Sequence, residues 1–184
     1  MTRYTPYYCE ENIWWLCQEP RCHAARREVV FISNELRACA LFCQRAAPAP
    51  DLPVLWDYHV VLAVHRERGV EVWDLDSTQG APLSASDWLA LTFGPAARLP
   101  EELHPRFRVV DADAYLAAFS SDRGHMRGPD GSWQAPPPEW PCIGQGEPTL
   151  ARFVDVGSPF VGEVLGLDAL RERWKAAGAS TRRR

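Results

Sequence analysis

The spacing of apolar residues changes along the first half of the chain, and it predicts one helix followed by strands. Within residues 9–18 the apolar side chains recur every three to four positions, the period of a helix with one buried face. These side chains are Ile13, Trp14, Leu16 and Cys17. Glu10 and Glu11 fall in the first turn, where acidic groups favour the positive end of a helix, and Pro20 marks its end.

Apolar runs after this helix predict β-strands. Residues 28–33 form a short apolar run typical of a buried strand, and residues 54–66 and 70–76 are rich in β-branched and aromatic side chains. Gly69 lies between the last two segments and supplies the positive φ that a tight turn requires. We therefore expect an antiparallel hairpin over 54–76, whereas residues 34–45 fit a helix and a strand equally well.

The second half of the chain predicts three helices, one strand and a long loop. The expected elements are a helix at 84–92, a strand at 106–110, and helices at 111–119 and 167–177. Ser84 or Ser86 caps the first of these helices, and Asp111 or Asp113 caps the second. Residues 120–148 are rich in Pro, Gly, Ser and Asp, which is typical of a functional or a disordered loop. Two tryptophans within it favour an ordered wrap over the surface.

Length and composition predict a single domain. The 184 residues are 46% hydrophobic and 24% charged, and we expect one domain over 1–184 with a flexible tail at 178–184. No apolar run reaches the about 18 residues that a membrane-spanning helix needs, and the N-terminus has no secretory-signal pattern. The net charge of −4 argues against a nucleic-acid partner, because such proteins usually carry a basic excess.

The cysteines allow two readings besides ordinary core packing. Six are present, at positions 9, 17, 22, 39, 43 and 142. Three disulfides would fit the number, but a chain of this size without a secretory signal favours reduced thiols in a cytoplasmic protein, or also a nuclear one in a eukaryote. A zinc site would draw on Cys17, Cys22, His23, Cys39 and Cys43. Because only the last two cysteines have zinc-like spacing, we expect core packing and no metal, and without a phosphate-binding glycine motif no cofactor.

Cys9 and His59 are the residues best suited to nucleophilic chemistry. Cys9 lies at the start of the expected helix, where unpaired amides and the helix dipole lower the pKa of a thiol. The alternative is a small buried hydrophobe, which most free cysteines are. His59 falls inside a buried strand, as either a core histidine or a general base. A nucleophilic thiol needs such a base, and the base needs a third group that orients it.

The predicted hairpin supplies a carboxylate that could orient this base. With a hairpin loop of two or four residues, His65 pairs with Val70 and His59 lies opposite Asp76. A tighter loop pairs His59 directly with Asp74. In both registers the imidazole and the two carboxylates share one face, because faces alternate with a period of two, whereas a three-residue loop would separate them. The chain therefore carries a plausible Cys, His and Asp set.

Long sequence blocks extend this interpretation over most of the chain. They are YYCEENIWWLC at 7–17, VVFISN at 29–34, VLWDYHVVL at 54–62, VWDLDS at 72–77, FRVVDADAYLAAFSSDRGHM at 107–126, DGSWQAPPPEWPCI at 130–143 and, more weakly, VGEVLGLDAL near the C-terminus. In this order they resemble the protein N-terminal glutamine amidohydrolase family. The segments 18–28, 38–52 and 77–103 fall outside the match.

The resemblance implies a fold, an activity and three catalytic residues. The implied fold is an α/β (α+β) domain, an antiparallel sheet packed by helices as in papain-like and transglutaminase-like cysteine enzymes. The implied activity of a monomer is hydrolysis of the side-chain amide of an N-terminal glutamine to glutamate and ammonia, in eukaryotes within an N-degron pathway. The family's triad falls on Cys9, His59 and Asp74, not Asp76, which the tighter hairpin register also favours. A thioester intermediate follows from this triad.

Recognition of the substrate requires further polar groups. A carboxylate or a ring of carbonyls must bind the free α-ammonium, and a second donor must join the backbone amide of Cys9 in an oxyanion hole. The candidates are Glu10, Glu11 and Asp122 for the ammonium, Asn12 and Tyr58 for the oxyanion, and Ser33 and Asn34 for the substrate backbone. For each of them separately, a surface or turn-capping role is the simpler interpretation.

Two other functions fit the same residues. A protease, a transglutaminase or an internal-glutamine deamidase could use the same order of Cys, His and Asp, and it would act on substrates without a free N-terminal amine. A module that binds N-terminal residues without turnover is the second alternative, although no member of the triad is missing from the sequence.

Overall fold

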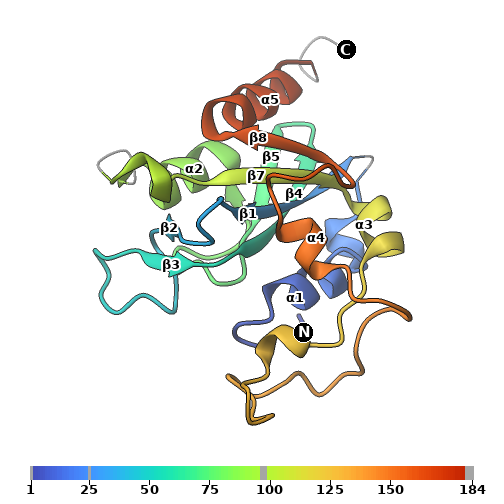
Figure 1. Cartoon of the computed structure of the whole chain (residues 1–184). Helices are drawn as coiled ribbons and strands as arrows, with labels where there is room; N and C mark the ends of the chain where they lie inside the picture. Colours follow the sequence, from blue (N-terminus) through green and yellow to red (C-terminus); the bar gives the residue numbers. More distant parts are fainter. Residues whose placement is uncertain (1, 25, 96–98, 181–184) are drawn as a thin grey trace.

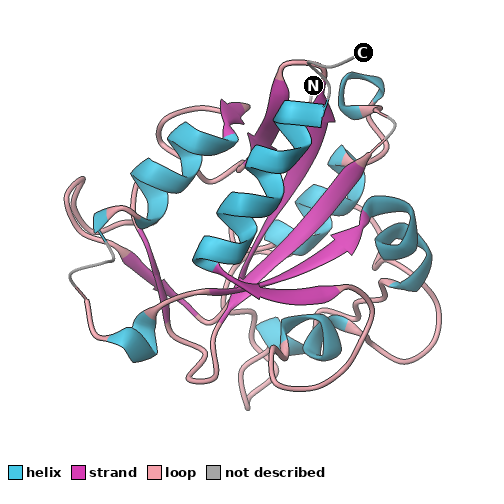
Figure 2. Cartoon of the chain, turned by 90° about the horizontal axis from the view of Figure 1, so that it is seen from above, coloured by secondary structure: helices cyan, strands magenta, loops and turns pink. Residues whose placement is uncertain are grey.

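A six-stranded antiparallel sheet forms the middle layer of the molecule, with helices on both faces (Figure 1, Figure 2). The computed structural model describes residues 2–24, 26–95 and 99–180. The strand order is β6-β5-β4-β1-β7-β8, and β2 and β3 form a separate two-stranded sheet. The strands are β1 (Arg27–Ser33), β2 (Cys39–Leu41), β3 (Val54–Trp56), β4 (His59–Arg66), β5 (Gly69–Trp73), β6 (Leu83–Ser84), β7 (Arg106–Asp111) and β8 (Glu163–Gly166). The helices are α1 (Cys9–Leu16), α2 (Ala85–Phe93), α3 (Ala112–Ala118), α4 (Leu150–Val154) and α5 (Leu167–Ser180), with 3-10 turns at Pro20–Cys22, Glu101–Leu103 and Gly124–Met126.

The two faces of the sheet bury two separate apolar clusters. In β1, Val29 and Phe31 belong to the cluster with α1, α3 and α4, while Val30 and Ile32 belong to the cluster with α2 and α5. β4 alternates in the same way. Both strands lie in the middle of the sheet and are covered on both faces, which explains why they have continuous apolar runs instead of alternating ones.

The expected helices are present, and two of them begin at a side-chain N-cap. α1 begins where the pattern predicts and ends two residues earlier, at Leu16 instead of residue 18. Ser84, not Ser86, caps α2, and Asp111, not Asp113, caps α3. Each cap accepts backbone N–H groups of the first turn, which have no partner within the helix.

The last helix is longer than expected. α5 extends to Ser180, so it includes residues 178–180 of the segment that was expected to be a flexible tail. The rest of that segment, 181–184, lies outside the described residues. Within the described part of the chain, no helix combines the length and the apolar character needed to cross a membrane.

The expected strand at 54–66 is divided in two, which corrects the prediction of a simple hairpin. Its first three residues are β3 and pair with β2, a strand within the 34–45 segment that the pattern left open. Asp57 and Tyr58 belong to neither strand, because a side-chain oxygen of Asp57 accepts the N–H of Tyr58 at 2.9 Å and the chain turns there. β4 then begins at His59 and forms the hairpin with β5.

The long loop at 120–148 is an ordered wrap, as its tryptophans indicate, and a buried ion pair holds it against α1 (Figure 1). The carboxylate of Glu11 accepts hydrogen bonds from Arg123 at 2.8 and 2.7 Å and from the indole N–H of Trp140 at 2.6 Å. Arg123, in a left-handed conformation with φ 60°, also donates to three carbonyls within residues 138–141. Glu11 of α1 therefore anchors two separate parts of the loop.

Candidate active site

Cys9, His59 and Asp74 come from three elements that meet at one end of the β4–β5 hairpin. Cys9 is the first residue of α1, which packs on β4; His59 is the first residue of β4; Asp74 directly follows β5. Cys9 and His59 both line a pocket of about 360 Å³, together with the acidic residues Asp57 and Asp76. The thiol and the imidazole thus open onto one cavity.

The hairpin register is the one in which His65 pairs with Val70. Its two-residue loop precedes Gly69, whose φ of +133° favours glycine as expected. By this register Asp74 would face residue 61, but β5 ends at residue 73 and the chain leaves the sheet. The tighter register is therefore wrong, and His59 meets Asp74 through the turn that follows the strand.

His59 and Asp74 form a buried, hydrogen-bonded pair. His59 Nε2 lies 2.9 Å from Asp74 Oδ1. Asp74 also accepts the side-chain amide of Gln44 at 3.0 Å, the indole N–H of Trp88 at 3.1 Å and the backbone N–H of Asp76 at 3.1 Å. Burial alone would raise the pKa of Asp74, but the imidazole and the other donors outweigh it and lower this pKa. Burial lowers the pKa of His59. The neighbouring carboxylate of Asp74 has the larger, opposite effect, so the pKa of His59 is raised overall.

The imidazole of His59 has a defined orientation and tautomer. Because Nε2 is bound to the carboxylate, the neutral ring carries its proton there and keeps a lone pair on Nδ1. Trp56 stacks on the ring, with centroids 5.8 Å apart and an interplanar angle of 17°. This arrangement suits a general base that accepts a proton at Nδ1.

Cys9 has the position expected of a nucleophile but not the expected pKa. Burial raises the pKa of its thiol well above the usual value, and the carboxylates of Glu10, Asp76 and Asp57 add to this effect. A backbone hydrogen bond from Val60 acts in the opposite direction. The expectation of a pKa lowered by the helix start is therefore wrong, because desolvation and three acids outweigh the helix dipole.

Glu10 is buried directly beside the thiol of Cys9. Its Oε2 accepts the hydroxyl of Tyr58 at 2.9 Å and lies 3.7 Å from Cys9 Sγ. His125 Nε2 lies 3.2 Å from the same hydroxyl and 3.6 Å from Glu10 Oε1. Among the described residues, Oε1 has no hydrogen-bond partner. Burial, the largest of several influences, raises the pKa of Glu10 to about 7.

Two of the residues considered for substrate binding, Glu11 and Asn12 of α1, have structural partners. The carboxylate of Glu11 is occupied by Arg123 and Trp140 and is fully buried, so it is not available to an ammonium group. The amide of Asn12 donates to the carbonyl of Thr5 and accepts its N–H, both at 2.8 Å. Asn12 therefore holds the chain before α1 and has no free donor for an oxyanion.

Three further candidates also have partners within the protein. The hydroxyl of Ser33 donates to the carbonyl of Asp57 at 2.6 Å, which fixes the turn before β4. The amide of Asn34 donates to two backbone carbonyls of neighbouring loops. Asp122 is exposed, and its carboxylate caps the N–H of Gly124 at 2.8 Å. The simpler, structural interpretation fits these residues, and of the candidates only Glu10 and Tyr58 lie beside the thiol.

Several residues that shape the site were not anticipated. Gln44 follows β2, Trp88 comes from α2, and both bind Asp74. His125 lies in a 3-10 turn of the long loop and lines the pocket. Packing between elements far apart in the chain brings them together, so no local pattern marks them; for His125 the composition of residues 120–148 predicts only a loop.

The same centre contains atoms that could bind a metal ion. One ligand atom each of His59, Asp74 and Asp76 lies within 4.8 Å of the others. However, Asp74 already accepts four hydrogen bonds, one of them from His59, so the arrangement fits a hydrogen-bonded network. The zinc site considered from the sequence does not form. Cys17 and Cys39, two of its expected ligands, are buried in clusters on opposite faces of the sheet.

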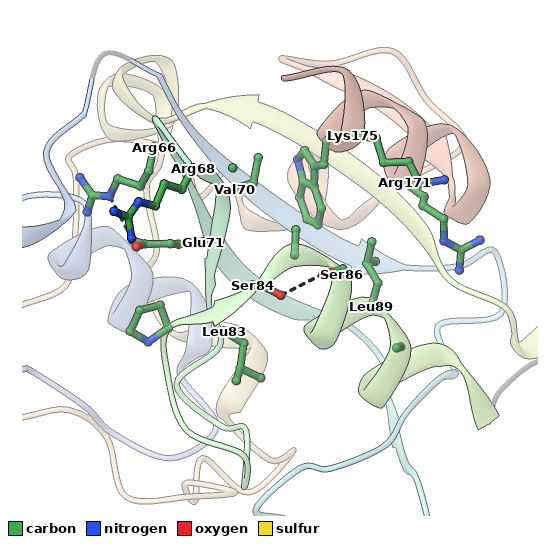
Figure 3. A pocket seen from close by; sticks show the side chains of 15 residues that line it. Arg66, Arg68, Val70, Glu71, Leu83, Ser84, Ser86, Leu89, Arg171 and Lys175 are labelled. Atoms are coloured by element: carbon green, nitrogen blue, oxygen red, sulfur yellow. Dashed lines mark hydrogen bonds and ion pairs between the residues drawn. The ribbon is translucent and has the colours of Figure 1, made fainter. Parts of the chain in front are cut away.

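A larger groove of about 570 Å³ lies between the β5–β6 edge, α2 and α5 (Figure 3). The described residues that line it include arginines, a lysine and apolar side chains, but neither cysteine nor histidine. The groove therefore lacks a nucleophile and base, and the pocket at Cys9 is the candidate active site.

Comparison with known proteins identifies the family. The family model for N-terminal glutamine amidase matches residues 4–174. The protein N-terminal glutamine amidohydrolase of Drosophila willistoni is 43% identical over 146 residues, covering 76% of this chain and 71% of that protein. Those of Drosophila melanogaster and Drosophila erecta are 42% identical over 151 residues, with the same coverage. The resemblance is thus confirmed, and the chain belongs to the N-terminal glutamine amidase family.

Proposed function

We propose that this protein hydrolyses the side-chain amide of an N-terminal glutamine in peptides or proteins, giving N-terminal glutamate and ammonia through Cys9, His59 and Asp74. Membership of the family supports the reaction. The observation that carries the assignment of residues is that a thiol and a carboxylate-bound imidazole open onto the same pocket. Such a set has a nucleophile, a base and a group that orients the base.

In the first half of the reaction, Cys9 attacks the carboxamide carbon of the glutamine side chain. The S–C bond forms as the thiol proton passes to Nδ1 of His59, and the carbonyl electron pair moves to oxygen. When this pair returns, the C–N bond breaks and the imidazolium gives its proton to the leaving ammonia. Asp74 stabilises the imidazolium throughout, which agrees with the raised pKa of His59.

In the second half, water hydrolyses the thioester. His59 takes a proton from the attacking water, the C–S bond breaks, and the proton returns to the sulfur of Cys9. The backbone N–H of Cys9, at the first position of α1, is a candidate oxyanion donor. Neither side chain considered for the second donor is free, because Asn12 donates to Thr5 and the hydroxyl of Tyr58 donates to Glu10.

The wider assignments rest on the resemblance. A helix that starts at a cysteine and packs on a strand that starts at a histidine supports the papain-like or transglutaminase-like core that the family implies. The family also implies a monomer, a cytoplasmic location with the nucleus as an addition in eukaryotes, and a place in an N-degron pathway there. The substrates would be peptides or proteins with a free N-terminal glutamine, with no nucleic acid and no membrane involved.

The proposal is tested by ammonia release from a short peptide that begins with glutamine. Peptides with N-terminal asparagine, internal glutamine and N-acetylated glutamine are the comparisons, and Cys9→Ala is the nucleophile variant. Cys142→Ala, which removes an exposed thiol, is the matched control. We expect release from the free glutamine peptide alone, abolished by Cys9→Ala and retained by Cys142→Ala. Cleavage of the acetylated or internal-glutamine peptides would instead indicate a protease or a general deamidase.

A further inference from the structure

The pocket at Cys9 is acidic. The carboxylates of Glu10, Asp57 and Asp76 all raise the pKa of the thiol, and Arg37 is the one arginine or lysine among the described residues that line the pocket. The thiolate form of Cys9 adds a further negative charge close to these three groups. Repulsion between the charges disfavours the thiolate. A cation that enters the pocket would offset this effect.

The base does not supply this missing positive charge. When His59 takes a proton, the imidazolium is already balanced by Asp74 at 2.9 Å. Among the described residues that line the pocket, only the guanidinium of Arg37 is then left to offset the three acids that face Cys9. The substrate that the proposed function assigns to this pocket carries a cation of its own, the α-ammonium of its first residue.

Among the three acids, Glu10 is the least shielded from the thiol. Its side chain is fully buried, its Oε2 lies 3.7 Å from the sulfur, and within the described residues its Oε1 lacks a hydrogen-bond partner. Asp57 is exposed to water and accepts the N–H of Tyr58, while Asp76 accepts the hydroxyl of Tyr4. Water and hydrogen bonds screen those two carboxylates, whereas a buried, half-satisfied one keeps most of its effect.

Tyr58 and His125 connect this buried carboxylate to the pocket. Both line the cavity, and both approach Glu10, the hydroxyl at 2.9 Å and the imidazole at 3.6 Å. The titratable groups that face Glu10 are Cys9 and Glu11 on its own helix, Tyr8 directly before that helix, Tyr58 and His59 around the start of β4, His125 in the long loop and Tyr115 on α3. None of them is a permanent cation, so Glu10 has no fixed counter-charge among these groups.

We propose that Glu10 makes the nucleophile depend on the free α-ammonium of the substrate, which binds at Tyr58 and His125 and offsets the buried carboxylate. The inference rests on the proposed function. It adds that Glu10 is the residue that senses the charge of the N-terminal amine and makes turnover depend on it.

The hydrogen-bond chain gives the coupling a physical route. An ammonium at this position donates to the hydroxyl oxygen of Tyr58, whose proton is directed to Glu10 Oε2. The cation then lies one hydrogen-bonded group away from the buried carboxylate, where its charge favours ionisation of Cys9. A glutamine that is internal or acetylated provides no such charge. It therefore loses turnover as well as binding.

The sharpest probe is a pair of peptides that differ in this charge alone. One begins with glutamine, and in the other a hydrogen replaces the α-ammonium, so the side-chain amide and the following residues are unchanged. For the unmodified protein we expect kcat/KM to favour the ammonium peptide on the order of 10²–10⁴-fold. The preference should include a fall in kcat for the des-amino peptide, because thiolate formation and not only binding is affected.

Glu10→Gln removes the charge and keeps an acceptor for the hydroxyl of Tyr58. We expect it to reduce the preference at least about tenfold, chiefly through faster turnover of the des-amino peptide. Asp57→Asn is the matched control, since it removes a charge from the same pocket and keeps the acceptor for the Tyr58 N–H; its preference should stay within about twofold. Alkylation of Cys9 by iodoacetamide across pH is a second readout, and Glu10→Gln should shift its midpoint to lower pH.

The outcomes separate this inference from the proposed function. An unchanged preference and alkylation midpoint in Glu10→Gln would overturn the inference, and a loss of preference in Asp57→Asn alone would assign the ammonium to Asp57 instead. If Glu10→Gln does not fold, Tyr58→Phe removes the connecting hydroxyl, and an unchanged preference there overturns the inference as well. Ammonia release that survives Cys9→Ala would overturn the proposed function itself, and it is measured independently of the preference.

Discussion

The pocket at Cys9 and the groove beside α5 lie at opposite ends of one hairpin and have opposite chemistry. His59, at the start of β4, lines the pocket, and Arg66, at its end, lines the groove. Seven residues of extended strand separate these two positions by roughly 23 Å. The pocket, of about 360 Å³, is bordered by acids, while the groove, of about 570 Å³, is bordered by cations.

The groove has the features by which binding sites are commonly recognised. Its floor is apolar and buried, formed by Val70, Leu89 and Trp174 among others. Figure 3 shows Arg66 and Arg68 on one side of this floor and Arg171 and Lys175 on the other. Arg66, Arg171 and Lys175 form surface ion pairs, such as the one between Arg171 and Asp168, whose carboxylate is 92% exposed. Exposed pairs of this kind interact weakly because water screens them.

The pocket is smaller and more polar, but several titratable groups at it are buried and shift the pKa values of one another. Asp74 raises the pKa of His59, and Glu10 raises the pKa of Cys9. Groups coupled in this way are the requirement for acid–base and nucleophilic chemistry. Coupling between buried groups, and not cavity volume or apolar lining, therefore distinguishes the candidate active site from the groove.

The strongest test of this comparison is Asp74→Asn. The change keeps the shape of the side chain but removes the charge that stabilises the imidazolium, and the amide now offers a donor where His59 Nε2 also donates. We expect kcat to fall on the order of 10²–10⁴-fold, by analogy with the same change in serine-enzyme triads. Asp168→Asn, near the groove, is the matched control and should leave kcat unchanged. A loss of less than about threefold for Asp74→Asn would mean that the buried pair does not act in turnover.

A second test compares a buried ion pair near the pocket with an exposed one near the groove. Arg123→Met leaves the carboxylate of Glu11 buried without its counter-ion, and we expect the free energy of unfolding to fall by about 3–5 kcal/mol. Arg171→Met breaks the surface pair and should cost less than about 1 kcal/mol. Urea unfolding measures both values. Equal losses would remove the distinction between the regions, whereas partial recovery in Arg123→Met with Glu11→Gln would identify the stranded charge as the cause.

The parts of the fold that were predicted depend on local patterns. The start of α1, the run of β1, and the caps Ser84 and Asp111 follow from residues close together in the chain. The division of the strand at Asp57 and the pairing of β2 with β3 were not predicted, because a side-chain hydrogen bond and a partner outside the hairpin decide them. α4, β6 and β8 were missed as well. They are short, and β8 pairs with β7 more than 50 residues earlier in the chain.

In the candidate site, too, the residues that were predicted are those that a local or family pattern marks. Cys9 and His59 were found from the helix start and the hairpin, and the family pattern selected Asp74 over its neighbour Asp76. The pKa of Cys9 was expected to move in the wrong direction, because the helix start is visible in the sequence and the desolvation is not. Trp88 was missed for a related reason: its indole reaches Asp74 only when α2 packs on the sheet.

Trp88 also allows a test of whether the two regions influence each other. Its N–H binds Asp74, and its ring lies 6.1 Å from that of Trp174 in the floor of the groove. Trp88→Phe keeps the packing and removes one of four donors, so we expect kcat to fall about tenfold, the low end for a hydrogen bond to a charged group. Trp174→Phe loses a bond to Glu28 instead and should lower stability but not kcat. Equal losses of kcat would show that the regions are coupled through these rings.

The smallest expected effect comes from reversing the charge of the groove. Arg171→Glu combined with Lys175→Glu changes its electrostatic potential greatly, but the pocket lies roughly 23 Å away along β4. At 0.15 M salt the Debye length is about 8 Å, so kcat/KM for a short glutamine peptide should stay within about twofold. Arg37→Glu, in the pocket lining, is the matched reversal, and it should lower kcat/KM severalfold because it adds a fourth acid near Cys9. A comparable loss in the groove variant at this salt concentration could not arise from screened charge. It would mean that the groove contacts the substrate or shifts the hairpin, and the two regions could then no longer be treated as independent.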